Sequence, residues 1–360
     1  MARDDHGSDG ARGRLKAARQ RVEAAIARTL GRLPAPVVQR MLARMPVEHG
    51  GHRLDPQVQW ADLLRKAARH RPIEHGSVAR ARREYRRMRV LERDPPRVTT
   101  QELRMAGDDG AIAARSYRPH TAHGDAALLY FHGGGGVIGD LESHDTICRT
   151  FAVRGGMTVV AVDYRLAPEV PYVAAADDAL AAMRWLRANA PRLGIASQRI
   201  AVGGDSRGGN LAAVLCQQLA LHGEPQPALQ VLIYPNTDVA GSYASRRAFA
   251  DGPWLTEPLM QWFERHALGE LDRADPRVSP LRADALHGLA PALVTIAGFD
   301  PLRDEGLAYA ERLREHGVAV QLLREPSLPH GYLQLTGVSK AAAEATDRLI
   351  DALRAALSGC

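Results

Sequence analysis

Residues 199–210 read RIAVGGDSRGGN, an apolar run that enters the pattern G-x-S-x-G and continues into a helical stretch. In a strand–turn–helix elbow of this kind, the serine sits in a cramped turn whose neighbours must be small, because a Cβ would clash there. Gly204, Gly208 and Gly209 supply that clearance around Ser206. Short patterns of this type also occur by chance in plain turns, but the strand before it and the helix after it favour the elbow.

Short apolar runs alternate with helical stretches after residue 98. We predict strands over residues 126–131, 157–162, 199–202, 229–234 and 292–297. We predict helices over residues 174–189, 208–222, 304–316 and 339–357. Buried strands that alternate with helices are typical of a mostly parallel sheet with both faces covered. The sequence therefore predicts an α/β domain over residues 98–360.

A reactive serine needs a base that takes its proton and an acid that orients the base. In α/β proteins with this elbow, the acid and then the base follow the serine on loops after later strands. Asp300 comes just after the predicted strand 292–297, and His330 follows the apolar run 318–323. Both loops are expected at the sheet edge that carries the serine. We therefore predict Ser206, Asp300 and His330 as a catalytic triad.

Other side chains compete for the acid and base roles. Asp304 and Glu305 are rival acids, but they fall in the first turn of the next predicted helix, where a capping or dipole role accounts for them. Most of the other histidines lie in helices or polar turns and are interpreted as surface residues. Asp300 and His330 are preferred for this reason.

A glycine-rich loop follows the first apolar run, with residues 131–139 reading FHGGGGVIG. Counted from Gly134 it fits the dinucleotide-binding pattern G-x-G-x-x-G, whereas counted from His132 it is an HGGG loop that stabilises an oxyanion. The polar residues 140–143 follow where a dinucleotide site should open its helix, and no Gly-Lys-Ser/Thr is present for a P-loop. We therefore predict backbone N–H donors to an oxyanion from Gly134, Gly135 and Arg207.

Charge is unevenly distributed over the 360 residues. The net charge of the whole chain is +6, whereas residues 1–97 alone carry 23 Lys and Arg against 11 Asp and Glu. Residues 1–12 are polar and are expected to be disordered. The arginine-rich run 80–87 has the electrostatics of a nucleic-acid or anionic-membrane binder, but no zinc-finger, RRM or helix-turn-helix signature accompanies it. A solvated helix face is the favoured interpretation, and no nucleic acid is expected as a partner.

The chain has three cysteines, Cys148, Cys216 and Cys360, which are far apart and form no CxxC site. They are expected to be free thiols in a reducing compartment. No apolar run reaches membrane-spanning length, and the N-terminus has no apolar leader segment. These features predict a cytoplasmic protein with no membrane span. The triad chemistry needs no metal and no organic cofactor, so neither is expected.

Several motifs in one order give the chain a family resemblance. They are HGGG at 132–135, DYRLAPE at 163–169, GDSRGG at 204–209, SPL at 279–281, DPLRDEG at 300–306 and PHG at 329–331. Over residues 98–355 the chain resembles the bacterial hormone-sensitive-lipase-like esterases, the GDSAG branch (family IV) of the α/β hydrolases. The resemblance implies an α/β-hydrolase fold whose helical cap comes from residues 1–97 and an insertion at about 237–268.

The same resemblance implies a function and a set of residue roles. It implies a serine carboxylesterase that acts on short to medium acyl-chain esters of small molecules through an acyl-enzyme, with the triad named above and the DYRLAPE segment supporting the HGGG loop. Trp254 and Leu255 of the insertion are expected in the wall of the substrate pocket or in packing between cap and core. Members of the family are often dimers, so a homodimer is expected by analogy.

Two residues depart from the family pattern. Gly136 stands where the family usually has an aromatic residue, which is expected to open the pocket wall. Arg207 replaces a small residue after the nucleophile, and its guanidinium is expected either to block the pocket or to favour anionic substrates. Peptidase or thioesterase activity and a noncatalytic ligand receptor on the same scaffold remain as alternatives. The receptor class lacks the triad histidine, whereas His330 is present here.

Overall fold

The structure is a computed structural model that describes residues 33–68, 71–107, 109–121 and 124–358. Its centre is a sheet of eight strands in the order β10-β9-β8-β7-β5-β6-β4-β3. Neighbouring strands from β10 to β6 are parallel, and β4 is antiparallel to both β6 and β3. The strands are β3 (Thr99–Gly107), β4 (Gly110–Arg118), β5 (Ala127–Phe131), β6 (Thr158–Asp163), β7 (Ile200–Asp205), β8 (Leu229–Ile233), β9 (Ala292–Phe299) and β10 (Val320–Pro329).

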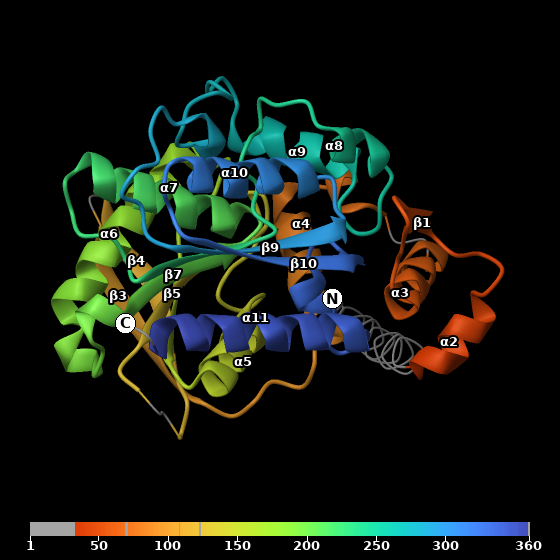
Figure 1. Cartoon of the computed structure of the whole chain (residues 1–360), viewed down its shortest axis with the longest axis horizontal. Coiled ribbons are helices and arrows are strands. Elements are labelled where there is room, and N and C mark those ends of the chain that lie inside the picture. Colours follow the sequence, from red (N-terminus) through yellow and green to blue (C-terminus); the bar gives the residue numbers. More distant parts are fainter. Residues whose placement is uncertain (1–32, 69–70, 108, 122–123, 359–360) are drawn as a thin grey trace, which may run out of the picture.

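Helices cover both faces of this sheet (Figure 1). One face packs against α6 (Val173–Asn189), α7 (Arg207–Leu221) and α10 (Arg303–Glu315), and the other against α5 (Asp145–Gly155) and α11 (Lys340–Ser358). The prediction of a mostly parallel sheet between two helical layers is confirmed. The five predicted strands and four predicted helices are present, with ends that differ by a few residues.

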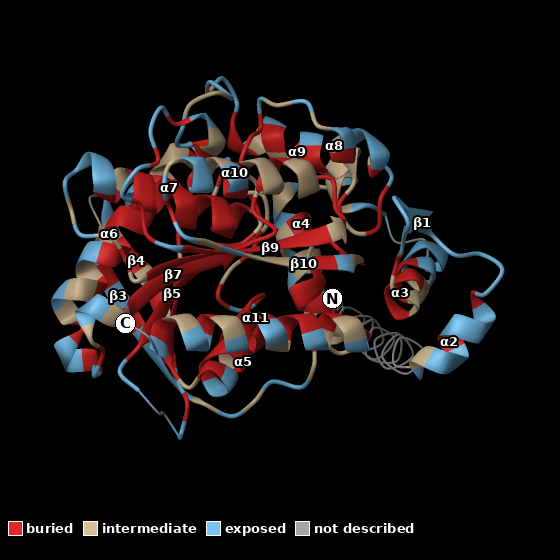
Figure 2. Ribbon diagram, viewed as in Figure 1, coloured by how far each residue is buried: buried red, intermediate tan, exposed pale blue. Residues whose placement is uncertain are grey.

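Strand β5 shows why the central strands read as continuous apolar runs. Leu129 and Phe131 pack into the cluster beneath α6 and α7, whereas Leu128 and Tyr130 pack into the cluster beneath α5 and α11. Successive side chains of a strand point to opposite faces, so a strand that is covered on both faces needs apolar residues at every position. Figure 2 shows the centre of the sheet as buried throughout.

Two segments outside the sheet lie near the ends of its strands. The first contains α2 (Ala35–Met41), the short strands β1 (Glu48–His49) and β2 (His52–Arg53), α3 (Pro56–Ala67), the 3-10 turn η1 (Ile73–His75), α4 (Val78–Arg87) and the 3-10 turn η2 (Met88–Leu91). The second, between β8 and β9, contains α8 (Ala244–Ala248) and α9 (Glu257–Ala267). The two segments meet where η1 contacts α9.

The start of α3 follows the sequence rules for a helix N-terminus. The Asp55 side chain accepts a hydrogen bond of 3.0 Å from the backbone N–H of Val58, and Pro56 occupies the first helical position. Both features satisfy or remove N–H groups that would otherwise lack partners. The predicted disorder of residues 1–12 concerns a part of the chain that lies outside the described residues. The predicted domain division at residue 97 stays a prediction.

Candidate active site

Ser206 occupies the turn between β7 and α7. Its backbone has φ 55° and ψ −116°, a conformation that is rare for a residue with a side chain. A Cβ at Gly204 or Gly208 would overlap the backbone carbonyl of Phe131. The Ser206 N–H donates to the carbonyl of Ile233 at 2.8 Å, which helps to hold the turn in place. The elbow predicted from the glycine pattern is therefore present, together with its steric cause.

The three residues predicted as a triad lie within hydrogen-bond distance of one another. His330 Nε2 is 2.9 Å from Ser206 Oγ, and His330 Nδ1 is 2.8 Å from Asp300 Oδ2. The second carboxylate oxygen of Asp300 accepts the backbone N–H of Leu302 at 2.8 Å. Asp300 is 1% exposed and His330 is 8% exposed. A proton path thus runs from the serine hydroxyl to the imidazole, and a buried carboxylate fixes the ring.

The rival acids are engaged elsewhere. Glu305 accepts the backbone N–H of Thr237 and the side-chain amide of Asn236, each at 2.7 Å. Asp304 accepts the backbone N–H of Ser245 at 2.8 Å. Both therefore tie the first turn of α10 to the segment that follows β8. Asp300 is the acid that faces His330.

The glycine loop, residues 132–139, lies beside the elbow. Gly134, Gly135 and Gly136 have φ values of 119°, 65° and 74°, which favour residues without a Cβ. A Cβ at Gly134 would overlap the backbone of Ile138, and one at Gly135 would overlap the ring of Phe263. Glycine is therefore required at Gly134 for the tight loop and at Gly135 for the close approach of α9.

Asp205 joins this loop to the elbow. Its Oδ1 accepts the backbone N–H of Gly133 at 2.9 Å and the hydroxyl of Tyr130 at 2.7 Å. His144 Nε2 lies 3.3 Å from the same oxygen, and both side chains are buried. Sequence reasoning missed His144, although it stands in the segment 143–145 directly after the loop.

Asp205 and His144 each stabilise the charged form of the other. Burial alone would raise the pKa of Asp205, but His144 and the hydrogen bonds from Tyr130 and Gly133 outweigh it and lower the pKa. Burial alone would likewise lower the pKa of His144, but the carboxylate of Asp205 outweighs it and raises the pKa. A carboxylate that stays ionised here keeps its hold on the glycine loop.

A cavity of about 1530 Å³ opens onto Ser206. It reaches His330, Gly134, Gly135 and Arg207, and both segments outside the sheet contribute to its walls. The apolar wall from the second segment includes Trp254, Leu255, Leu259, Met260 and Phe263. Trp254 and Leu255, which were predicted as pocket residues, thus lie in this wall.

Gly136 and Arg207 sit differently from what the family pattern suggested. Gly136 is outside the cavity wall, and a Cβ there would lie 2.7 Å from the ring of Tyr172. The Arg207 guanidinium lies 4.5 Å from the centre of that same ring and donates to the carbonyl of Val278 at 3.3 Å. Arg207 is only 4% exposed. Its charge is therefore packed on an aromatic face, in the manner of a cation–π contact.

Neither a metal-binding cluster nor a membrane-spanning helix is found in the part of the chain that the structure describes. No three His, Cys, Asp or Glu side chains there come together in a way that could hold a metal ion. None of the helices there is both long enough and apolar enough to cross a bilayer. Cys148 and Cys216 are free and buried.

Comparison with known proteins agrees with this fold. The sequence model of the alpha/beta hydrolase fold family matches residues 128–334. This range contains Ser206, Asp300, His330 and the glycine loop. The chain therefore belongs to the alpha/beta hydrolase family.

Individual relatives are similar over most of the chain. The carboxylic ester hydrolase LipN of Mycobacterium tuberculosis is 40% identical over 338 residues, which cover 91% of this chain and 89% of LipN. The ethyl acetate hydrolase of Pseudomonas putida is 40% identical, over 82% of this chain and 96% of its own. Among solved structures, the ester hydrolase EH1AB1 from the metagenome of Lake Arreo, in complex with a bipyridine phosphonate derivative, is 41% identical with a TM-score of 0.81. That comparison covers 84% of this chain and 98% of EH1AB1.

Proposed function

We propose that this chain is a serine carboxylesterase that hydrolyses short to medium acyl-chain esters of small molecules through an acyl-enzyme intermediate. The observation that carries the proposal is the unbroken hydrogen-bonded series from Ser206 through His330 to the buried Asp300. The relatives named for ester hydrolysis, at about 40% identity over most of the chain, support the same reaction.

The triad geometry suits nucleophilic attack on an ester carbonyl. His330 Nε2 takes the proton from Ser206 Oγ as the oxygen attacks, and Asp300 holds the ring and stabilises the imidazolium that forms. The histidine then returns the proton to the leaving alcohol. Water attacks the acyl-enzyme with the same base, which regenerates the serine.

Charge that develops on the carbonyl oxygen needs donors in fixed positions. We assign this role to the backbone N–H groups of Gly134, Gly135 and Arg207, which border the cavity next to Ser206. Donors that are oriented before the reaction stabilise the transition state without further reorganisation, and each is worth roughly 3 kcal/mol. No metal or cofactor takes part in these steps.

The cavity has room and apolar walls for an ester substrate. Its apolar wall suits an acyl or alcohol chain, and its volume exceeds that of many small-ligand sites, which are roughly 300–1000 Å³. The name of the Pseudomonas putida relative, ethyl acetate hydrolase, supports the short-chain end of this range. A cytoplasmic location is part of the proposal, supported by the two buried free thiols. A homodimer is proposed only by analogy with the family.

The first prediction concerns the nucleophile. With p-nitrophenyl acetate, butyrate, octanoate and palmitate as substrates, the parent protein should be most active on the shorter esters. Ser206→Ala should lower kcat/KM by roughly 10⁴-fold or more, because no other group can attack the carbonyl from that position. Ser197→Ala, which changes an exposed serine, serves as the matched control and should behave like the parent.

A noncatalytic receptor would give a different result. If parent and Ser206→Ala were equally inactive while esters still raised the Tm of both, the pocket would bind ligand without turnover. Equal and substantial activity in both proteins would place the nucleophile elsewhere.

A further inference from the structure

Arg82 of α4 reaches from the N-terminal segment to the glycine loop beside Ser206. Its Nε donates to the carbonyl of Val137 at 2.9 Å, and its Nη2 donates to the carbonyl of Ala167 at 3.1 Å. The same guanidinium forms a two-point ion pair with Glu169, with distances of 2.8 Å and 2.7 Å. One side chain from the cap thus binds two separate core segments at once.

Val137 is part of the turn that shapes the glycine loop. Its N–H donates to the carbonyl of Gly134 at 3.1 Å, and the N–H of Ile138 donates to the same carbonyl at 3.0 Å. The carbonyl of Gly136 accepts the N–H of Ala167 at 2.9 Å. The carbonyls of Gly136 and Val137 are therefore both held from outside the loop, by Ala167 and by Arg82.

A loop with several consecutive glycines needs such external contacts. Glycine has more conformational freedom to lose than any other residue, so an unrestrained loop would present its N–H groups in many directions. Oxyanion donors act only when they already point to the place where charge develops. The contacts to Gly136 and Val137 supply that restraint in one part of the loop, and Asp205 holds Gly133 in another.

We propose that Arg82 is a positioning residue for the oxyanion hole, and that it couples docking of α4 to the geometry of the glycine loop. This inference rests on the proposed esterase function. Arg82 touches no reacting atom and acts through the carbonyl of Val137. Glu169 of the DYRLAPE segment holds the guanidinium in the orientation that reaches this carbonyl.

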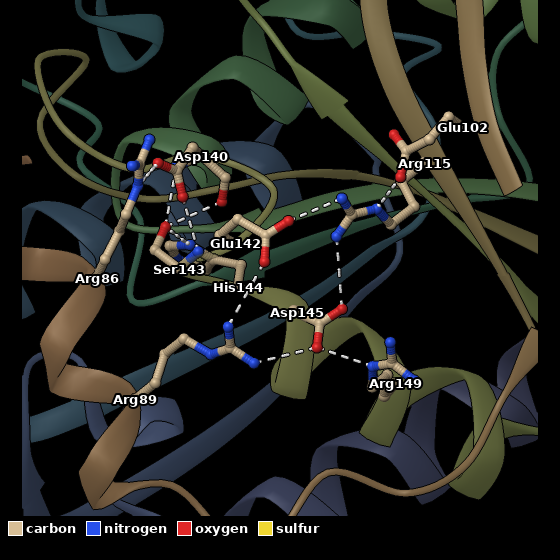
Figure 3. Close-up of polar contacts among 10 residues, drawn as sticks. All are labelled: Arg86, Arg89, Glu102, Arg115, Asp140, Glu142, Ser143, His144, Asp145 and Arg149. Atoms are coloured by element: carbon tan, nitrogen blue, oxygen red, sulfur yellow. Dashed lines mark hydrogen bonds and ion pairs between the residues drawn. The ribbon is translucent and has the colours of Figure 1, made fainter. Parts of the chain in front are cut away.

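Two neighbouring arginines join the N-terminal segment to the core through side chains that follow the glycine loop. Arg86 pairs with Asp140, and Arg89 of η2 pairs with Glu142 and Asp145 (Figure 3). These ion pairs also join the N-terminal segment to the core, but they end on side chains that follow the loop. Arg86→Gln therefore removes a docking contact and leaves the contact with Val137 intact.

The kinetic test compares Arg82→Lys and Arg82→Gln with the parent. Lysine keeps the charge opposite Glu169 but lacks the planar fork that serves two carbonyls and a carboxylate together. We expect both variants to lose kcat by roughly tenfold or more, with KM within about twofold of the parent. The Ki of a trifluoromethyl ketone, whose serine adduct carries an oxyanion, should rise by the same factor as kcat/KM falls. Arg86→Gln and the exposed Arg83→Gln should match the parent.

Hydrogen exchange gives a second readout that does not depend on turnover. Amides of residues 132–139 should exchange faster in Arg82→Gln than in the parent, and at the parent rate in Arg86→Gln. If Arg82→Lys had the kcat and Ki of the parent, Arg82 would act only as a charge that docks α4, and the proposal would be overturned. Unchanged hydrogen exchange in Arg82→Gln would also overturn it. Ser206→Ala in the same ester assay separates the two ideas. If it retained the parent activity, Ser206 would not be the nucleophile and the proposed serine mechanism would fail, while the exchange data would still decide whether Arg82 holds the loop.

Discussion

Gly136 and Arg207 are neighbours in space. The side chain of Arg207 lies on the ring of Tyr172, and its Cγ is 3.8 Å from where a Cβ of Gly136 would be. A larger residue at position 136 would compete with both side chains for this space. The two departures from the family pattern thus form one packing unit. Sequence reasoning found each of them, but their contact joins residues that are far apart in the chain and so left no local signal.

Glu92 is a buried carboxylate that no sequence pattern singled out. It is 2% exposed, and neither carboxylate oxygen has a hydrogen-bond partner among the described residues. Burial raises its pKa from 4.5 to about 7, although the charges of His144 and Arg89 oppose the shift. The protonated form is therefore favoured in the folded protein over a wide pH range.

The pH dependence of stability follows from this raised pKa. Between pH 4.5 and about 7 the folded state binds a proton at Glu92 that the unfolded state has lost, so the free energy of unfolding falls as pH rises. In Glu92→Gln the fall across this window should be smaller by up to about 3 kcal/mol. Urea unfolding at several pH values measures the difference. Glu311→Gln, at an exposed position, is the control, and an equal pH slope in parent and Glu92→Gln would refute the assignment.

At the scale of elements, α4 differs most from its sequence interpretation. The run of arginines was interpreted as a solvated face, but Arg82 and Arg86 pair with acids of the core. Their partners Glu169 and Asp140 lie more than fifty positions away along the chain. A charge pattern indicates which side chains could form ion pairs, but it does not show which distant acids the fold brings to them. Part of the positive charge before residue 97 thus forms ion pairs that join α4 to the core.

The sequence analysis did not predict β3 or α5, because their burial leaves no clear apolar pattern in the sequence. In β3, only Leu103 and Met105 are buried, because this strand is at the edge of the sheet and much of its surface faces solvent. Helix α5 mixes buried threonines and an aspartate with apolar residues, so no clear apolar stripe marks it. The central strands were predictable because burial on both faces requires uninterrupted apolar residues.

Helix α9 bounds the cavity beside the glycine loop. Phe263 lies against Gly135 and lines the cavity next to the loop, so it limits the space beside Ser206. Phe263→Ala should raise the ratio of kcat/KM for p-nitrophenyl octanoate over acetate by roughly tenfold, since a few added methylene contacts in an apolar pocket have effects of this size. Gln261→Ala, an exposed change on the same helix, should leave the ratio as in the parent. If Phe263→Ala left this ratio unchanged, Phe263 would serve only in packing α9 against the core and would not limit the substrate.

At the scale of the whole molecule, the sheet brings the candidate active site together. Ser206 follows β7, Asp300 follows β9 and His330 follows β10, and the carboxyl ends of parallel strands share one edge. Chain order and strand ends were enough to predict these three residues. The cavity was less predictable, because its walls combine α9 with the N-terminal segment, whose position depends on ion pairs between distant residues.

Covalent labelling tests the central claim, that Ser206 is the nucleophile, most directly. A p-nitrophenyl alkylphosphonate should react once per chain and release one equivalent of p-nitrophenol, because the attacking oxygen becomes bonded to phosphorus. Peptide mass spectrometry should place the adduct on Ser206, and ester hydrolysis should disappear in proportion to labelling. His330→Gln should label far more slowly, since the serine then lacks its base. Full ester hydrolysis by a protein that is completely labelled at Ser206, or inactivation with the label on another residue, would contradict the account.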